Sequence, residues 1–178
     1  MPPASDLSPQ ASRLKPCTIV LLMGVAGSGK TTIGRKLAVE LHWPYYEADD
    51  FHSVANKAKM GRGMPLGDTD RAPWLAAIRH AMDECAAQGR SAVYSCSALK
   101  EKYRQVLAIG LPGLRLFYLS GDRDLLLQRI AGRTGHYMKP GMLDSQLAAL
   151  EAPADALMLD IRHPPETLVA EIRKELGV

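Results

Sequence analysis

A run of eight residues, from Gly24 to Thr31, has the composition of a phosphate-binding loop. Its pattern is G-x-x-x-x-G-K-[ST], in which glycines adopt backbone angles closed to other residues and successive N–H groups turn toward a phosphate. Lys30 is expected to reach the β- and γ-phosphates, and the Thr31 hydroxyl to ligate Mg²⁺. The pattern indicates ATP as the ligand, and the expected nucleotide-binding residues here are Gly24, Val25, Ala26, Gly27, Ser28, Gly29, Lys30, Thr31 and Thr32.

Acidic residues follow a short apolar and aromatic run at residues 45–48. A phosphoryl-transfer enzyme needs a carboxylate that orients the acceptor hydroxyl and takes its proton, and the carboxyl ends of strands line the ligand crevice of α/β sheets. Asp49 is the candidate for this catalytic base, and Glu47 is the candidate to help hold Mg²⁺ through water. The alternative is that these acids only cap the next segment.

Two arginines four residues apart, Arg129 and Arg133, stand at the end of an expected helix. Cations that close over the transferred phosphoryl group neutralise the charge on its oxygens, which is most of the catalysis in this chemistry. We therefore expect Arg129 to bind the nucleotide, Arg133 to be catalytic, and residues 133–143 to form a lid. The alternative is a solvated arginine pair, because basic side chains are favourable at a helix C-terminus.

The segments that must position these groups alternate along the sequence between strand-like and helix-like patterns, about five times. Continuous β-branched and aliphatic runs are typical of strands buried on both faces, and apolar residues four apart are typical of amphipathic helices. The alternation predicts an α/β fold with a parallel sheet and helices on both faces. Strands are expected at residues 18–23, 45–48, 91–95, 114–119 and 157–161.

Helices are expected from residue 30 to 42, from a cap at residues 68–70 to Gly89, after Asp122 and after Pro164. Two stretches, residues 51–71 and 133–143, lack periodicity, and we expect binding loops or lids there.

Length and composition exclude several other classes of protein. The chain has 178 residues, 47% hydrophobic and 23% charged, which favours one ordered domain. The net charge of +3 gives no support to a nucleic-acid partner, and no apolar run is long enough to span a membrane. Three cysteines in no metal spacing favour reduced thiols and a cytoplasmic location. Residues 1–16 are expected to be a flexible tail, and residues 17–178 a single domain.

Nucleotide binding alone leaves the reaction open. A GTPase would carry an N/T-K-x-D string, which the sequence lacks. A motor ATPase needs a strand that ends in paired acids, whereas the third expected strand runs into Ser95-Cys96-Ser97. The remaining class is that of the compact phosphoryl-transfer enzymes, which bind a second substrate beside the phosphate loop.

Several further strings stand out in the sequence: Asp49-Asp50-Phe51-His52, Gly63-Met64-Pro65-Leu66, Pro73-Trp74-Leu75, Cys96-Ser97-Ala98-Leu99-Lys100, Gly135-His136-Tyr137-Met138 and Ser145-Gln146. Taken together, they resemble the gluconokinase family of P-loop kinases, over residues 19–176. The resemblance implies a three-layer α/β/α fold with a five-stranded parallel sheet and a helical lid. It also implies transfer of the ATP γ-phosphoryl group to the 6-hydroxyl of D-gluconate, with Mg²⁺, in a homodimer.

Gluconate is a small anion with many hydroxyls, so its site should combine cations with hydrogen-bonding groups. Arg71 and Arg104 are the preferred partners of the carboxylate, because a guanidinium binds it through two parallel hydrogen bonds. Asp68 and Asp70 are interpreted as helix caps and Trp74 as core. The expected substrate-binding residues are Asp49, His52, Lys59, Arg71, Lys100, Arg104 and His136.

The sequence departs from the family pattern at Glu47, where an aspartate is common, and at Ala26, where a serine is frequent. Two other hypotheses stay open. One is a kinase on the same scaffold that acts on shikimate, a nucleoside or a nucleotide. The other is a nucleotide-dependent binding module, for example for RNA.

Overall fold

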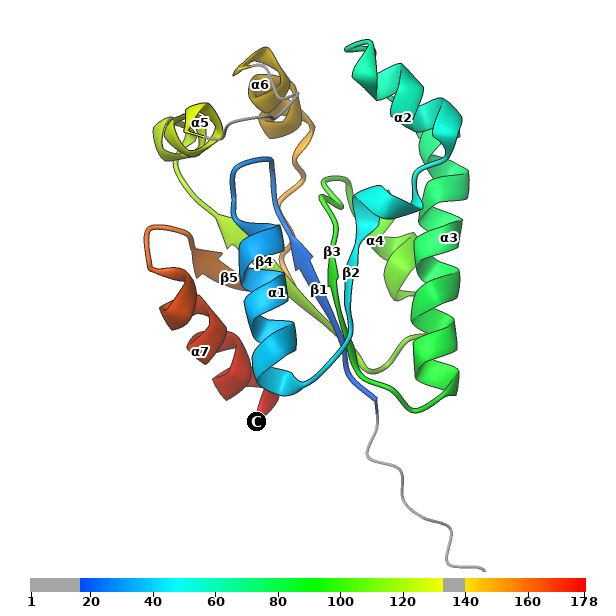
Figure 1. Cartoon of the computed structure of the whole chain (residues 1–178), viewed down its shortest axis with the longest axis vertical. Helices are drawn as coiled ribbons and strands as arrows, with labels where there is room; N and C mark the ends of the chain where they lie inside the picture. Colours follow the sequence, from blue (N-terminus) through cyan, green and yellow to red (C-terminus); the bar gives the residue numbers. More distant parts are fainter. Residues whose placement is uncertain (1–16, 133–139) are drawn as a thin grey trace, which may run out of the picture.

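The computed structural model describes residues 17–132 and 140–178 (Figure 1). The expected tail at residues 1–16 and most of the expected lid lie outside the described residues. The described chain folds around one parallel sheet with the strand order β2-β3-β1-β4-β5. Its strands are β1 (Ile19–Met23), β2 (Tyr45–Glu47), β3 (Ala92–Ser95), β4 (Leu114–Ser120) and β5 (Leu157–Asp160). The five-stranded parallel sheet is therefore confirmed.

β1 is the centre of the sheet, and all five of its residues are buried. Its side chains alternate between two apolar clusters, because successive residues of a strand point to opposite faces. Val20 and Leu22 pack in one cluster, and Ile19, Leu21 and Met23 pack in the other. Burial on both faces explains the unbroken apolar run.

Helices cover both faces of the sheet, which gives the three layers (Figure 1). α1 (Lys30–Leu41) and α7 (Pro165–Leu176) contribute residues such as Leu37 and Ile172 to the first cluster. α3 (Asp68–Ala87) and α4 (Glu101–Ala108) contribute Ile78 and Leu107 to the second. The three-layer α/β/α class is confirmed.

The remaining elements rise above the carboxyl ends of the strands. They are a 3₁₀ turn (Ala48–Phe51), α2 (Val54–Gly61), α5 (Arg123–Ala131) and α6 (Pro140–Ala149). Figure 1 shows α2 on one side of this end of the molecule and α5 with α6 on the other. These elements therefore frame the edge of the sheet at which ligands bind in open α/β folds.

The expectation of an irregular stretch at residues 51–71 is wrong, because α2 lies within it. The helix is capped by Ser53, whose hydroxyl accepts a hydrogen bond from the Asn56 N–H at 3.1 Å. Its one buried residue is Asn56, whose amide donates to the Asp70 carbonyl at 2.8 Å. A helix that docks through a polar side chain leaves no apolar stripe in the sequence.

α4 was also not predicted, and α6 was expected only in so far as a helical lid at residues 133–143 overlaps its start. The N-cap residue of α3 is Gly67, so Asp68 begins the helix itself; of residues 68–70, Asp70 takes part in the cap, because its carboxylate accepts from the Gly67 N–H. Among the described helices, none combines the length and the apolar character that a membrane span requires.

Candidate active site

The phosphate loop, residues 24–31, connects β1 to α1 through positions that only glycine can occupy. Gly24 and Gly27 have φ angles of 148° and 81°. A Cβ on Gly24 would lie 2.7 Å from the Leu119 carbonyl oxygen, and one on Gly27 would lie 2.9 Å from that of Leu126. The loop is therefore seated against β4 and α5 so tightly that its shape is set by packing as well as by its own sequence.

Lys30 is the first residue of α1, at the helix end that carries the positive dipole. Its ammonium group folds back over the loop and donates to the carbonyls of Gly24 at 3.0 Å and Val25 at 3.1 Å. The lysine is thereby held at the phosphate loop, within reach of any phosphate that the loop binds.

Thr31 and Glu47 meet at the next position of the site. The Thr31 hydroxyl donates to the Glu47 carboxylate at 2.8 Å, and the Tyr45 hydroxyl donates to the same oxygen at 2.6 Å. Burial, followed by the bond to Glu47, raises the pKa of Tyr45, so this phenol stays protonated and keeps donating.

The residues at this position fit Mg²⁺. The ion prefers oxygen ligands and is usually held by one or two carboxylates together with substrate phosphates. Thr31 and Glu47 supply a hydroxyl and a carboxylate side by side, next to the loop that would bring the phosphates. A glutamate in place of the common aspartate still reaches the Thr31 hydroxyl.

Asp49 lies in the 3₁₀ turn that follows β2, and its side chain is exposed. The turn is fixed from below by Trp74, whose indole N–H donates to the Ala48 carbonyl at 2.7 Å. Burial first, and then the negative charge of Asp49, raise the pKa of the Cys96 thiol to about 12, while the positive charge of Lys30 opposes them. Asp49 and Lys30 thus both act on Cys96, directly after β3.

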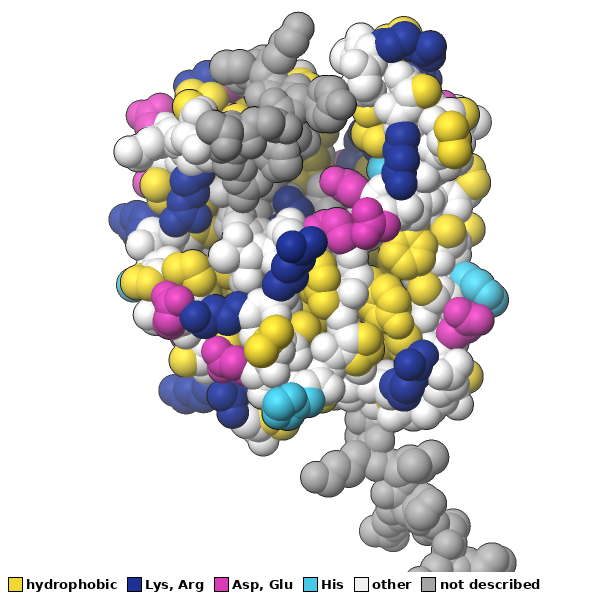
Figure 2. Space-filling model, viewed as in Figure 1, with side chains coloured by type: hydrophobic (Ala, Val, Ile, Leu, Met, Phe, Trp, Pro, Cys, Tyr) yellow, Lys and Arg dark blue, Asp and Glu magenta, His cyan; other side chains and the backbone are white. Residues whose placement is uncertain are grey.

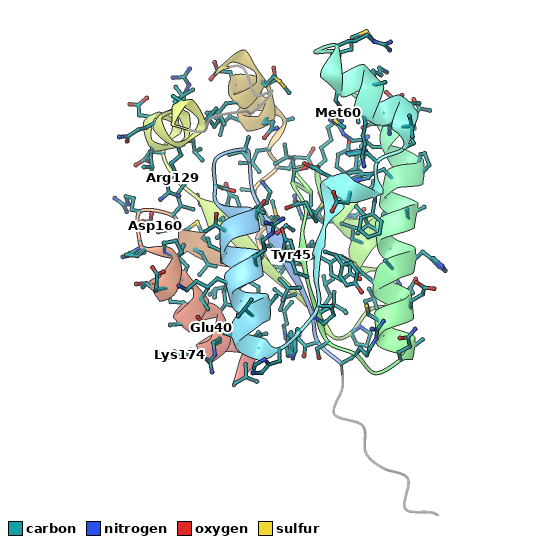
Figure 3. All side chains as sticks on the ribbon, in the orientation of Figure 1. Glu40, Tyr45, Met60, Arg129, Asp160 and Lys174 are labelled. Carbon is teal, nitrogen blue, oxygen red and sulfur yellow. The ribbon has the colours of Figure 1, made fainter. Side chains whose placement is uncertain are left out.

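Arg129 reaches from α5 to the opposite side of the phosphate loop (Figure 3). Its guanidinium donates to the Ile161 carbonyl at 2.6 Å, and another of its nitrogens lies 3.9 Å from the Cβ position of Gly29. The arginine therefore stands between the loop and the end of β5. Arg133 and His136 lie outside the described residues.

The cations expected to bind substrate are paired with acids in the structure. Lys59 of α2 forms an ion pair with Asp70 at 2.6 Å, and Lys100 lies 3.5 Å from Asp68. Both carboxylates belong to the first turn of α3, where Asp70 also accepts from the Gly67 N–H at 2.7 Å. Lys59 is the first cause that lowers the pKa of Asp70.

Tyr103 of α4 joins these pairs into one cluster. Its hydroxyl bonds to Asp68, and Arg71 donates to that hydroxyl at 3.3 Å. Lys100 and Lys102 each place an ammonium group over its ring, at 5.7 and 5.8 Å from the centroid. We call this cluster the acceptor network; it comprises Lys59, Asp68, Asp70, Arg71, Lys100, Lys102 and Tyr103.

Four members of the acceptor network, Asp68, Asp70, Lys102 and Tyr103, were missing from the expected substrate site. The two acids were interpreted as helix caps, which is correct for Asp70 but incomplete. Tyr103, next to Arg104, belongs to the strings that resemble the gluconokinase family, but it was given no role in the site. One signal in the sequence could have indicated the two aspartates. Lys59, Arg71 and Lys100 were expected near one ligand, and such a cluster of cations needs acidic partners when the ligand is absent.

His52 follows the 3₁₀ turn and is buried. Its ring stacks on that of Trp74 at a centroid distance of 4.5 Å and an angle of 9°. Burial, followed by the charges of Arg71 and Lys57, lowers the pKa of His52 to about 4. The side chain is therefore neutral at physiological pH, and its buried Nδ1 has no hydrogen-bond partner among the described atoms. It suits a hydroxyl of a ligand better than a carboxylate.

Arg104 differs from its expected role. Its side chain is 5% exposed, and one of its terminal nitrogens donates to the carbonyls of Ala98 at 3.0 Å and Leu99 at 3.1 Å. Its other two side-chain nitrogens bond to Glu101. Ala98 has a left-handed φ of 41°, unusual for a residue with a Cβ. The guanidinium thus supports the turn after β3, and we leave it out of the substrate contacts.

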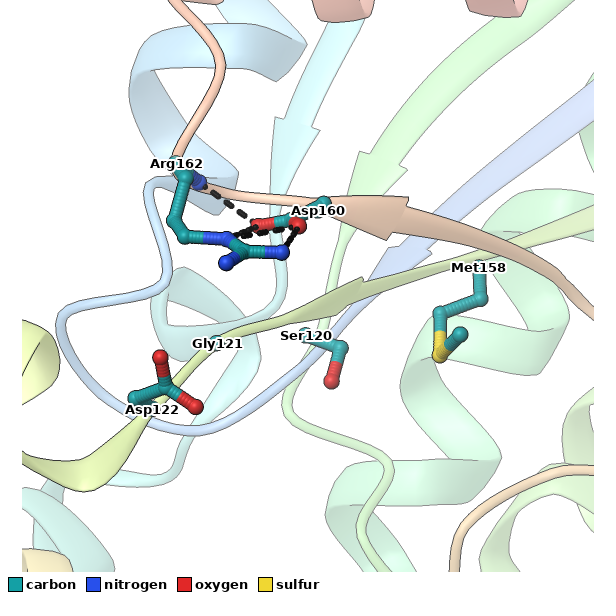
Figure 4. Close-up of a pocket in the computed structure, with 6 residues that line it drawn as sticks. All are labelled: Ser120, Gly121, Asp122, Met158, Asp160 and Arg162. Carbon is teal, nitrogen blue, oxygen red and sulfur yellow. Dashed lines mark hydrogen bonds and ion pairs between the residues drawn. The ribbon is translucent and has the colours of Figure 1, made fainter.

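The surface over the strand ends is hollowed between the α2 side and the α5–α6 side, with acidic side chains along its lower edge (Figure 2). A separate cavity of about 250 Å³ lies at the ends of β4 and β5 (Figure 4). Its charged residues Asp160 and Arg162 pair with each other at 2.5 Å, which lowers the pKa of Asp160 to about 2. This cavity lacks the catalytic groups, and we assign it no role.

The fold and the phosphate loop define a P-loop kinase, a phosphotransferase. Similar chains narrow the class. A probable gluconokinase of Xenopus tropicalis is 39% identical, covering 89% of this chain and 93% of its own. The crystal structure of a sugar kinase from a Janibacter species is 44% identical with a TM-score of 0.85, covering 92% and 96%. A Sinorhizobium meliloti gluconokinase structure is 38% identical with a TM-score of 0.76, covering 91% and 96%.

The chain also matches a family model described as shikimate kinase, over residues 26–172. A shikimate kinase structure from Aquifex aeolicus is only 16% identical, with a TM-score of 0.58, and shows a shared fold alone. The gluconokinases are far more similar in sequence over nearly the whole chain. The protein belongs to the gluconokinase family.

Proposed function

We propose that the protein transfers the γ-phosphoryl group of ATP to the 6-hydroxyl of D-gluconate, giving 6-phospho-D-gluconate and ADP. The observation that carries this proposal is the position of Asp49. It lies in the 3₁₀ turn after β2, and this turn is hydrogen-bonded to Trp74 of α3, the helix that also carries Asp68, Asp70 and Arg71. The charges of Asp49 and Lys30 both act on the Cys96 thiol after β3, which supports a base, a phosphate site and a polar acceptor site at one edge of the sheet.

Each residue of the phosphate side has a role in this proposal. The backbone N–H groups of the phosphate loop bind the phosphates, and Lys30 neutralises charge on the β- and γ-phosphates. Thr31 and Glu47 hold Mg²⁺, which when bound supplies positive charge against the phosphate oxygens. Arg129 binds the nucleotide from α5, and Arg133 contributes a second cation from the lid.

Asp49 acts on the acceptor. Its carboxylate accepts a hydrogen bond from the 6-hydroxyl and takes the proton as the oxygen attacks phosphorus. Trp74 holds the turn that carries Asp49, so the base is presented in a fixed direction. Without this group the hydroxyl would have to lose its proton to water.

The acceptor network supplies the recognition of gluconate. Arg71, Lys59 and Lys100 provide positive charge for the carboxylate, and neutral His52 provides a ring nitrogen for a hydroxyl. Because Asp68 and Asp70 already hold the lysines, the substrate carboxylate has to join or replace an existing ion pair. This exchange favours a small polyhydroxy acid over an uncharged acceptor. His136 remains a proposed contact from the lid.

The alternative acceptor with a specific observation in its favour is shikimate, through the match to the family model. A coupled assay of ADP release over D-gluconate, shikimate, other sugar acids, nucleosides and nucleotides separates the two. We expect gluconate to give the highest kcat/KM. A higher value with shikimate would replace the proposed substrate, and ATP binding without turnover on any acceptor would indicate a binding module.

We also propose that the protein works as a homodimer in the cytoplasm. The proposal of a dimer is based on the family resemblance. The three cysteines, Cys17, Cys85 and Cys96, are unpaired, in keeping with a reducing compartment. Light scattering coupled to gel filtration tests the dimer: a mass near 39 kDa, about twice the 19.4 kDa of the chain, supports it, and 19.4 kDa would refute it.

A further inference from the structure

Both helices that flank the lid segment rest on the phosphate loop, at consecutive residues. On one side Gly27 packs against α5, where its Cβ position is 3.0 Å from an Ile130 side-chain carbon. On the other side Gln146 of α6 accepts a hydrogen bond from the Ala26 N–H through its side-chain oxygen, at 2.7 Å. The Ala26–Gln146 bond joins residues 120 positions apart. None of the roles proposed above uses it.

The same peptide group also contacts the catalytic lysine. The carbonyl of Val25 and the N–H of Ala26 belong to one peptide unit, and that carbonyl accepts from the Lys30 ammonium at 3.1 Å. No peptide bond in the described chain is cis, so the carbonyl and the N–H of this unit point in opposite directions. The peptide is therefore held at both ends, by Gln146 on the outer side of the loop and by Lys30 on the inner side.

We propose that Gln146 is a positioning residue for phosphoryl transfer, acting through the Val25–Ala26 peptide on Lys30. By accepting the Ala26 N–H it fixes the orientation in which the Val25 carbonyl faces the lysine. The ammonium group is then held at the loop before ATP arrives. Since Gln146 belongs to α6, the same bond ties the C-terminal side of the lid to the catalytic lysine. The inference rests on the kinase function proposed above.

Three variants separate this role from a merely structural one. Gln146→Met keeps the length of the side chain and removes the acceptor; we expect kcat to fall about tenfold, which is ~1.4 kcal/mol. The affinity for ADP, measured by calorimetry, should change less than about threefold, because the backbone N–H groups still bind its phosphates. Gln146→Glu retains an oxygen acceptor and should keep kcat within about threefold of the wild type. Gln128→Met, on the exposed side of α5, is the matched control and should leave kcat unchanged.

The decisive test is a double-mutant cycle with Lys30, measured by single-turnover transfer of labelled phosphate to gluconate. If Gln146 acts through the lysine, Gln146→Met should change the residual rate of the Lys30→Met enzyme less than about twofold. An equal loss in both backgrounds would show a structural role and overturn the proposal. So would an unchanged kcat in Gln146→Met, or tighter ATP binding, which would make the glutamine a competitor of the phosphate.

Two complications, a wrong acceptor and a variant that does not fold, can be told apart from failure of this inference. If gluconate is not the acceptor, no variant and no wild-type enzyme will turn it over, and the cycle is run on the acceptor that the panel identifies. If Gln146→Met fails to fold, judged by its thermal transition, Gln146→Glu carries the test. A loss of about tenfold in that variant, despite its retained acceptor, would contradict the proposal.

Discussion

The two sides of the active-site crevice are built in different ways. The phosphate loop is a backbone site: Gly24 and Gly27 pack against β4 and α5 so closely that no side chain fits there, and its lysine is bound to carbonyls of the loop itself. The acceptor network is a side-chain site, in which lysines and an arginine contact the exposed Asp68, the half-buried Asp70 and a tyrosine.

This difference explains how each side reaches its working state. The phosphate loop needs little rearrangement, because backbone N–H groups at a helix N-terminus already favour an anion. The cations of the acceptor network contact Asp68, Asp70 and Tyr103, so in the proposed function a carboxylate substrate has to compete with the two aspartates for the lysines. Changes to the phosphate side should therefore affect turnover, and changes to the acceptor side should affect the concentration of gluconate that is needed.

The largest expected effect is on the group that links the two sides. Asp49→Asn removes the proposed base and should lower kcat by about 10²–10⁴-fold in the coupled assay. The affinity for ATP should stay within a factor of about three, because the amide is nearly isosteric and the phosphate loop is unchanged.

Asp50→Asn is the matched control, since this exposed neighbour lies in the same 3₁₀ turn. It should retain nearly full kcat. If Asp49→Asn kept the wild-type kcat, or if Asp50→Asn alone lost it, Asp49 would not be the base.

A smaller effect is expected when the proposed Mg²⁺ site on the phosphate side is changed. Glu47→Gln keeps an oxygen for the Thr31 hydroxyl but loses the negative charge, and it should raise the Mg²⁺ concentration for half-maximal rate by about 10–100-fold. Titration of Mg²⁺ at fixed ATP measures this shift. Tyr45→Phe, which removes a hydroxyl from the same carboxylate, should cause a smaller shift; equal Mg²⁺ curves for Glu47→Gln and the wild type would remove Glu47 from the metal site.

On the acceptor side the prediction is a change in KM. Lys59→Met breaks the pair with Asp70 and removes a cation; it should raise the KM for gluconate about tenfold and leave the KM for ATP unchanged. Lys57→Met, two positions away on the same helix, is the control, because that lysine donates to the Asp50 carbonyl at 3.1 Å. A rise in the KM for ATP as large as that for gluconate would show that the two sides are not separable in this way.

The smallest effect concerns stability. His52 has a pKa of about 4 in the folded protein, below its ordinary value near 6.5, so the unfolded chain binds more protons between these two values. Stability from this group is complete above about pH 6.5 and is lost on acidification toward pH 4, with a slope of at most about 1.4 kcal/mol per pH unit.

His52→Phe keeps a ring against Trp74 and removes the titration. Urea unfolding of both proteins from pH 4 to pH 7 should show a shallower dependence in the variant. Identical slopes would mean that His52 titrates normally in the folded protein.

The sequence was most informative where function is carried by the backbone. A phosphate loop needs glycines at fixed positions, so its pattern can be read directly, and the buried central strand is an unbroken apolar run for a similar reason. Asp49 could be placed because strand ends line the crevice in this class of sheet.

Side-chain pairing could not be read in the same way. Arg104 and Arg71 are both arginines in basic surroundings, yet one is buried beneath the Ala98 turn and the other faces Tyr103. Which of them is available to a ligand depends on tertiary contacts. α2 escaped prediction because Asn56 docks it through a hydrogen bond, which leaves no periodic signal.

The central claim is that this crevice phosphorylates the 6-hydroxyl of gluconate. The most direct measurement is transfer of the labelled γ-phosphate of ATP to D-gluconate, with the product identified by ³¹P and ¹³C nuclear magnetic resonance. We predict a single product phosphorylated at carbon 6, and no transfer to 6-deoxy-D-gluconate. Phosphate at another carbon, or equal transfer to the deoxy compound, would contradict the account.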